Sequence, residues 1–242
     1  EAVLLPPAGH GDPPGSLQGG RLRARGLGTA RLATAGRVLV AADLAGRTVV
    51  VAVDAGRLDD RRPVQGMDPR MGLVEATGTA IPVGTAEVVE APWPAAAGRA
   101  RLALAHELVG ASRAMLELAR VHALERKQFG RPIAAFQAVR HRLADALVAI
   151  EAAEAAVDAA WEDPWAGAPA AAKAVAGRAA ATVARHAQQV LAGIGFTTEH
   201  PFHRYARRAL VLDQLFGSAG GLTRALGREL LHDRRLPAPP AL

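Results

Sequence analysis

The chain contains no cysteine, which excludes disulfides, thiol catalysis and cysteine-ligated zinc. A cysteine-free chain is compatible with a reducing compartment, and we expect a cytoplasmic protein. Aromatic residues make up only 4% of the 242 residues. No apolar run approaches the roughly 20 residues that a membrane-spanning helix needs, so we expect no association with a membrane.

Lysine is almost missing as well, because Lys127 and Lys173 are the only two among 29 basic side chains. The others are arginines, and against 23 acidic residues they give a net charge of +6. These arginines are dispersed, and no nucleic-acid-binding motif accompanies them. We therefore interpret them as a solvated surface that would also accept an anionic cofactor, and we expect no nucleic-acid partner.

The composition changes near residue 95. Before it, glycine and proline recur among short β-branched runs, which predict strands at 37–41, 48–53, about 73–80 and about 85–89. Residues 42–47 would connect the first two strands, and residues 66–70 form a turn by composition. Residues 1–20 hold four prolines and five glycines, and we predict a loop or a frayed end there.

After residue 98 the apolar period becomes helical. A stripe of apolar residues predicts a long helix that ends at Gly130-Arg131-Pro132: Leu104, Leu108, Ala111, Met115 and Leu118. A second stripe predicts a helix that stops near Asp163-Pro164: Val139, Leu143, Leu147, Ile150 and Ala153. An alanine-rich third helix would run from about Pro169 to Leu191, followed by shorter helices at about 201–212 and 218–232 and a proline-rich tail at 237–240.

These patterns predict an α+β fold that is mostly α. A small antiparallel β domain (1–97) would be followed by a bundle of long antiparallel helices (98–242). Strands and helices do not alternate along the chain, which excludes a doubly wound nucleotide-binding sheet.

Three segments coincide with the ends of the predicted helices. Residues 125–133 close the first, Phe136-Gln137 open the second, and Gln189 to Arg204 follow the third. In order and spacing they resemble the C-terminal helical domain of the acyl-CoA dehydrogenase family. The preceding strands resemble the later part of that family's middle β domain, with Gly66-Met67-Asp68 at the expected turn. The family's N-terminal helical domain has no counterpart in this sequence, so we expect either a longer product or a subunit without that region.

The resemblance implies an FAD site at a subunit interface. In the family, the position of Arg126, with Gln128, Phe129 and Gln137 beside it, reaches the FAD of the neighbouring subunit. A guanidinium there could hold the pyrophosphate by paired, charge-assisted hydrogen bonds. The alternative is a solvated arginine favoured by the helix dipole.

A second group of residues matches the family's contacts to the rest of the cofactor and to the substrate. The adenine half of FAD would lie at Gln189, Gly193 and Gly195, although Ala192 replaces a usual glycine and Arg208 a usual acidic residue. Ser218 would contact the cofactor, and Arg101 and Gly217 the acyl-CoA. The alternatives are an ordinary glycine helix cap and, for Arg101, a surface cation.

A catalytic base is missing from both of the family's usual positions. The family's Glu-Gly-Thr is replaced by Phe216-Gly217-Ser218, and the other position falls on Ala100. Neither side chain can accept the proton that dehydrogenation removes from the α-carbon. Glu107 could be a displaced base or an ordinary surface glutamate.

We therefore expect a non-catalytic subunit of a heteromeric acyl-CoA dehydrogenase of the steroid-degrading type, self-associating through its long helices. Two alternatives remain: a flavin-dependent oxidase or monooxygenase on the same fold, and a non-catalytic structural homologue. His200 and His203 lack a nearby carboxylate pair, so we expect no metal.

Overall fold

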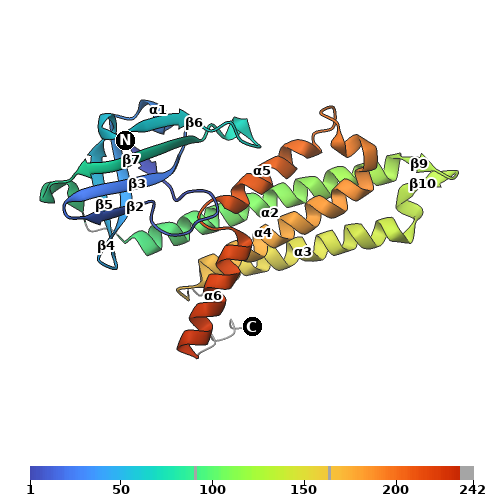
Figure 1. The fold of residues 1–242 in the computed structure, drawn as a ribbon. Helices are drawn as coiled ribbons and strands as arrows, with labels where there is room; N and C mark the ends of the chain where they lie inside the picture. The colour runs from blue at the N-terminus through green and yellow to red at the C-terminus, as the bar shows by residue number, and fades with distance from the viewer. Residues whose placement is uncertain (90–91, 163–164, 235–242) are drawn as a thin grey trace. The chain divides into compact units, whose positions relative to one another are not determined.

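The computed structural model describes residues 1–89, 92–162 and 165–234 (Figure 1). Its contacts divide the chain into two compact units. The first comprises residues 1–100 with the short segment 214–218, and the second comprises 101–213 with the residues from 219 onward. The expected fold class, α+β and mostly α, is confirmed.

The first unit is built around one eight-stranded sheet. Its strands are β1 (Ala2–Leu4), β2 (Gly15–Gln18), β3 (Arg21–Gly28), β4 (Arg37–Leu44), β5 (Arg47–Asp54), β6 (Asp60–Pro63), β7 (Val74–Pro82) and β8 (Val88–Val89). Short helical turns connect them: α1 (Arg31–Thr34), η1 (Ala55–Arg57), η2 (Pro69–Met71) and η3 (Thr85–Glu87). The order is β6-β7-β3-β2-β4-β5-β8, and β4 pairs in parallel with both β1 and β2, so the sheet is mixed.

The β4–β5 hairpin supplies the centre of this unit's core. Its strands are longer than the predicted 37–41 and 48–53, and only Ala45 and Gly46 remain between them. Both turn residues have positive φ, 50° and 81°, which suits the twist of a tight hairpin. Valines at alternate positions point inward and are fully buried: Val38, Val40, Val51 and Val53.

The prediction of a loop over residues 1–20 was wrong. β1 and β2 lie end to end between β3 and β4, and the intervening loop leaves the sheet and returns to it. Leu5 and Leu27 exchange two backbone hydrogen bonds of 2.6 and 3.0 Å, so β1 also joins β3. Strands of three and four residues, flanked by prolines and glycines, are too short to show the alternation of apolar and polar residues that predicts a strand.

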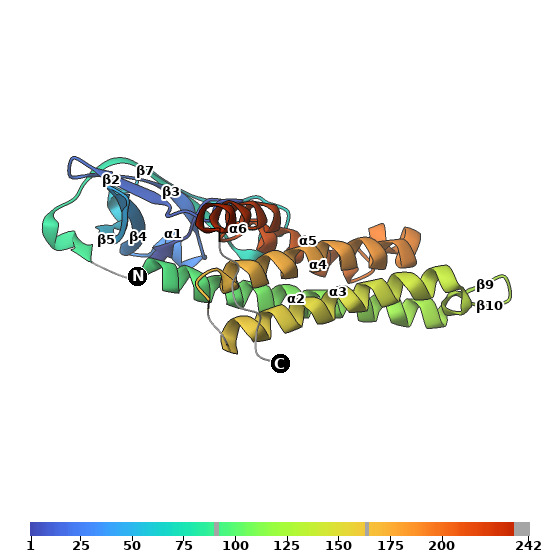
Figure 2. The same cartoon turned by 90° about the horizontal axis from the view of Figure 1, so that it is seen from below.

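The second unit consists of long helices. It contains α2 (Trp93–Glu125, which begins in the first unit), β9 (Lys127–Gln128), β10 (Arg131–Pro132), η4 (Ile133–Ala135), α3 (Gln137–Glu162), α4 (Ala168–Leu191), η5 (Ala192–Phe196), α5 (Phe202–Gln214) and α6 (Ala219–Asp233). α4 packs along both α3 and α6 (Figure 2). Seven of the eleven buried residues of α4 are alanine or glycine, which lets neighbouring helices approach closely.

Two details of the helices differ from expectation. α2 ends at Glu125, and Gly130 belongs to a small hairpin of β9 and β10 rather than to a helix end. On α3, Leu147 is 45% exposed, because the buried stripe runs one position earlier, through Ala146. The predicted breaks at 163–164 and 237–240 lie outside the described residues. Among the helices that are described, none has the length and apolarity to cross a membrane.

Gly26 provides a test of the position of β1. A Cβ on Gly26 would overlap the Leu5 carbonyl oxygen and lie 2.9 Å from the Leu4 side chain. Gly26→Ala should therefore destabilise the chain by about 3 kcal/mol, because backbone cannot yield as a flexible side chain can. Gly36→Ala is the matched control, since nothing lies within 4 Å of its Cβ. Equal unfolding free energies for the two variants in urea would contradict this pairing.

Candidate functional site

The hairpin that follows α2 is held by main-chain hydrogen bonds. The Arg126 N–H donates to the His122 carbonyl at 2.8 Å, and the Ile133 N–H donates to the Arg126 carbonyl at 2.8 Å. Between the strands, Phe129 and Gly130 both have positive φ, 52° and 77°. Such a turn favours Asn-Gly, so a phenylalanine in its first position is strained.

This strained residue is also exposed. The Phe129 side chain is 90% accessible, and its only aromatic neighbour among the described residues is Phe136, edge-on at 6.1 Å. The Arg131 guanidinium lies 4.3 Å above the Phe136 ring. The hairpin, which main-chain hydrogen bonds hold in place, therefore exposes the apolar ring of Phe129. Such exposure is typical of a residue that contacts another molecule.

Arg126 lies at the root of the same hairpin and is exposed. No described carboxylate is ion-paired with its guanidinium. The Arg126 charge acts on nearby His122: the pKa of His122 is lowered by burial first and then by His200 and Arg126, whereas Glu125 acts to raise it. The exposed Arg126 guanidinium is suited to binding an anion.

The C-terminus of α4 carries the second predicted group. Gln189 and Gly193 are exposed, whereas Gly195 is buried beneath Gln188, whose Nε2 would lie 2.5 Å from an added Cβ. Between them, Ala192 has φ 51° and ψ −132°, a conformation that suits glycine and strains alanine. The Gln188 amide donates to the Ala192 carbonyl at 3.3 Å and braces this turn.

The two groups lie at the same end of the helical unit. α3 leads away from the hairpin and α4 returns toward it, so residues 189–195 lie at the same end of the helical unit as residues 126–137 (Figures 1 and 2). His200, which follows α4, acts on the pKa of His122 near the end of α2. The structure thus places at one end of this unit the two groups that the sequence predicted to bind FAD, one from Arg126 to Gln137 and one from Gln189 to Gly195.

The residues predicted for substrate and base lie toward the other end. Arg101 stands in the early part of α2, and its charge acts on Lys173 near the start of α4. Lys173 in turn donates to the carbonyl of Asp213, the residue immediately before segment 214–218. From Arg101 to Glu125, α2 is about 36 Å long at 1.5 Å per residue.

Neither of the two family positions for the base holds a carboxylate. Phe216 is buried, has φ 55°, and stacks on Trp93 with ring centroids 6.1 Å apart. Gly217 follows with φ 100°, and Ser218 immediately precedes α6. Ala100 is half-buried. Non-glycine residues rarely have positive φ, so the backbone conformation of Phe216 in this apolar stack is unusual.

Glu107 has a partner. Its carboxylate oxygen lies 3.4 Å from Nε of Arg208, the arginine that stands where the family usually has an acidic residue. The ion pair links α2 to α5 and leaves both side chains partly exposed. Glu107 therefore contributes to the packing of these helices.

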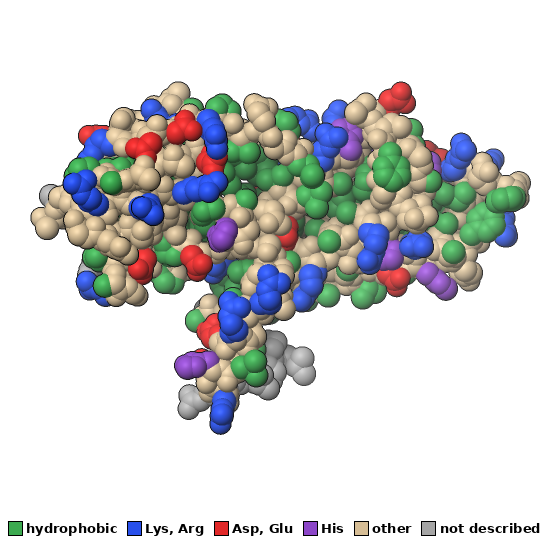
Figure 3. All heavy atoms as spheres, viewed as in Figure 1, with side chains coloured by type: hydrophobic (Ala, Val, Ile, Leu, Met, Phe, Trp, Pro, Cys, Tyr) green, Lys and Arg blue, Asp and Glu red, His purple; other side chains and the backbone are tan. Residues whose placement is uncertain are grey.

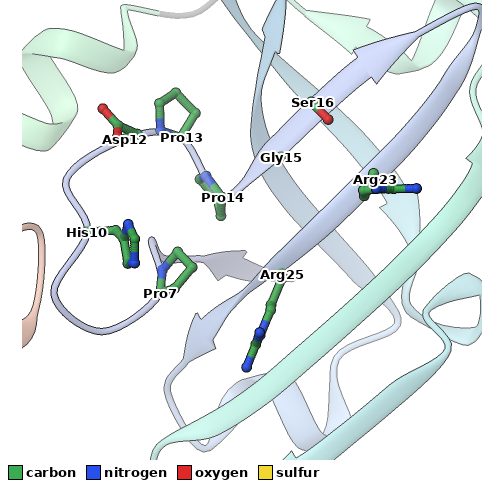
Figure 4. Close-up of a pocket in the computed structure, with 9 residues that line it drawn as sticks. All are labelled: Pro7, His10, Asp12, Pro13, Pro14, Gly15, Ser16, Arg23 and Arg25. Atoms are coloured by element: carbon green, nitrogen blue, oxygen red, sulfur yellow. The ribbon is translucent and has the colours of Figure 1, made fainter.

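The first unit has an open pocket of about 310 Å³ (Figure 4). It is lined by Pro7, His10, Asp12, Pro13, Pro14, Gly15, Ser16, Arg23 and Arg25. The two arginines point in different directions, and Nε of Arg25 lies 3.1 Å from the Glu75 carboxylate. With Asp12 also in its wall, the pocket has mixed charge and does not form a cationic cradle.

The two histidines near the start of α5 make local contacts. The Phe202 N–H donates to Nδ1 of His200 at 3.3 Å, and Nδ1 of His203 lies 2.8 Å from the His200 carbonyl oxygen. The described part of the chain holds no group of three or more side chains that could ligate a metal.

The chain thus combines a β unit with a unit of long helices, and an exposed arginine and an exposed aromatic ring follow the first long helix. The model of the acyl-CoA dehydrogenase C-terminal domain matches residues 95–231. The chain belongs to the acyl-CoA dehydrogenase family, whose members are FAD-dependent oxidoreductases of lipid metabolism.

Relatives and solved structures agree with this assignment. Acyl-CoA dehydrogenase IpdE2 of Mycobacterium tuberculosis is 36% identical over 189 residues, which cover 75% of this chain and 57% of the relative. The ChsE4-ChsE5 complex from the same organism superimposes with a TM-score of 0.77 at 29% identity, over 98% of this chain and 66% of that one. The Tcur3481-Tcur3483 steroid ACAD gives 0.74 at 25% identity, over 96% and 67%. The chain spans about half the length of the IpdE2 relatives that it matches.

Several residues that shape these two ends were not singled out from the sequence. Trp93 stacks on Phe216, His122 lies close enough to Arg126 to be affected by its charge, and Lys173 with Asp213 anchors the end of α5. Lys173 could have been found, because it is a lone charge on the apolar face of an alanine-rich helix. Trp93 could not, because its partner is 123 positions away.

Ala192 gives a stability test of the turn at the end of α4. Replacing Ala192 with glycine should raise the free energy of unfolding by about 1 kcal/mol, because glycine adopts this φ and ψ without strain. The same replacement at Ala181, exposed within α4, should lower it by roughly 0.5–1 kcal/mol. Urea denaturation measures both, and destabilisation by Ala192→Gly would show that the turn is not strained as described.

Proposed function

We propose that this chain is a subunit of an acyl-CoA dehydrogenase which completes an FAD site shared with another subunit and supplies no catalytic base of its own. One observation carries the proposal: the hairpin of Arg126 and Phe129 and the residues near Arg101 and Asp213 lie at opposite ends of a helix about 36 Å long. A flavin ring bound at one end cannot react at the other. Each end of this chain would therefore serve a different site.

The residues at the hairpin end have the chemistry that FAD requires. The Arg126 guanidinium, which no described carboxylate neutralises, would bind the pyrophosphate. The exposed Phe129 ring would cover an apolar part of the cofactor, and Gln189 with Gly193 would receive the adenine half. When bound, FAD supplies the hydride acceptor of the dehydrogenation. This chain's residues would hold and orient the cofactor and exclude water from it.

The base would come from the partner subunit. Removal of the α-proton of a thioester needs a carboxylate within reach, and Phe216 stacked on Trp93 provides only apolar surface. The ChsE4-ChsE5 and Tcur3481-Tcur3483 structures each combine two differently named chains, which supports a heteromer. The Tcur3481-Tcur3483 protein is a steroid ACAD, which supports a bulky acyl-CoA as the substrate of this chain's complex and an acyl-CoA dehydrogenase-type chain as the partner.

The alternative, a structural homologue without flavin, is supported by one observation. Ala192 places a methyl group and backbone strain where the family has glycine. This alternative predicts that no flavin accompanies the chain, with or without a partner.

Arg126→Ala tests the arm directly in a complex of this chain with an acyl-CoA dehydrogenase-type partner chain. Loss of a charge-assisted phosphate contact should weaken FAD binding by roughly 1.5–3 kcal/mol, or about 10- to 150-fold, in a fluorescence titration. The thermal stability of the isolated chain should change little. Arg120→Ala is the matched control, because Arg120 is bonded to Glu117 on the same helix. Unchanged FAD affinity in Arg126→Ala would contradict the arm assignment.

The isolated chain should not convert acyl-CoA thioesters to enoyl-CoA with an artificial electron acceptor. A positioned base contributes roughly 10²–10⁴-fold to such a rate, and neither family position supplies one. Straight-chain and steroid side-chain thioesters should both remain unreacted. Robust turnover would contradict the proposal, and its loss in Glu107→Gln would then identify Glu107 as the base.

A further inference from the structure

Among the described residues, Lys173 is the only buried basic or acidic residue, and its exposed fraction is 0%. It lies on the alanine-rich face of α4, where a charge is costly. Its Nζ donates to the main-chain carbonyl of Asp213 at 2.9 Å. Packing alone does not explain an ammonium group at this buried position, because an apolar side chain of similar length would fill the same volume.

The contact lies at a junction between helices. The Asp213 carboxylate accepts a hydrogen bond of 3.0 Å from the N–H of Ala219, the first residue of α6. Lys173 therefore binds the main chain of Asp213, and the Asp213 side chain in turn binds Ala219 at the start of α6. Segment 214–218 is the stretch of chain between these two anchored residues.

Gly177 lies one turn after Lys173 on the same face of α4. A Cβ there would overlap the Asp213 carboxylate and lie 3.0 Å from Cβ of Ala219. Glycine thus lets α4 approach both anchored residues at once. Lys173 and Gly177 together hold the junction from one helix.

The charges around Lys173 oppose one another. Burial lowers the pKa of Lys173 to about 8, the Asp213 carboxylate on α5 acts to raise it, and Arg101 on α2 acts to lower it further. Between pH 8 and about 10.5, the buried lysine is largely neutral while an exposed lysine would be charged. Any opening that exposes Lys173 must then take up a proton, so opening becomes rarer as the pH rises through this range.

We propose that Lys173 is a positioning residue which, with Gly177, fixes the Asp213–Ala219 junction and thereby the conformation of segment 214–218. This segment carries Phe216 and Gly217 in left-handed conformations, which local sequence alone would not maintain. The inference goes beyond the proposed function and requires no flavin, so the failure of either is distinguishable from the failure of the other.

Amide hydrogen exchange of the 242-residue chain tests the proposal, with Lys173→Met compared against Lys127→Met, the other lysine of this sequence. In Lys173→Met, the peptide covering 212–219 should exchange at least about tenfold faster, while peptides from β4 and β5 exchange as in the wild type. The thermal midpoint should stay within about 3 °C, because methionine fills the volume and removes a buried charge. Unchanged exchange at 212–219, or equal acceleration in β4 and β5, would overturn the proposal.

A second variant leaves Lys173 intact. Gly177→Ala should displace Asp213 and accelerate exchange at 212–219, whereas Gly110→Ala, with nothing within 4 Å of its Cβ, should not. In the wild type, opening of 212–219 should be at least about fivefold rarer at pH 9.5 than at pH 7 after correction for intrinsic rates. A wild-type segment without this pH dependence, or a Gly177→Ala variant that exchanges like Gly110→Ala, would contradict the positioning role.

Discussion

The close antiparallel packing of α3 and α4 is the constraint on which the rest of the helical unit depends. Alanine and glycine on the inner face of α4 allow this approach, and the antiparallel course of α4 returns residues 189–195 to the end of the unit at which α3 begins. The same geometry places Lys173 and Asp213 toward the opposite end. Between Arg101 and Glu125, α2 rises by about 36 Å.

The proposed function would give a use for the arm to a family member that has no carboxylate at the usual base positions. Phe216 is stacked on Trp93, and the Glu107 carboxylate is paired with Arg208. Arg126 and Phe129, in contrast, are exposed at a strained hairpin. Under that proposal this chain would contact the cofactor, and its partner would carry out the proton transfer.

The long helices and the β4–β5 hairpin could be predicted from the sequence, because many residues repeat one period. β1 and β2 could not, since each is too short to show alternation and gains its hydrogen bonds from strands far along the chain. The residues proposed for the flavin arm were singled out because their order and spacing at helix ends resemble the family, and their role stays a prediction. The placement of Arg101 and of residues 126–132 toward opposite ends of α2 follows from the length of that helix.

The most direct test is the flavin content of the chain purified alone and purified together with an acyl-CoA dehydrogenase-type partner chain. Absorbance near 450 nm, divided by the amount of each polypeptide, gives flavin per subunit. The shared-site account predicts no flavin on the chain alone, and a flavin-containing complex in which both chains are present in equal amounts. Stoichiometric flavin on the isolated chain, or a stable complex without flavin, would contradict it.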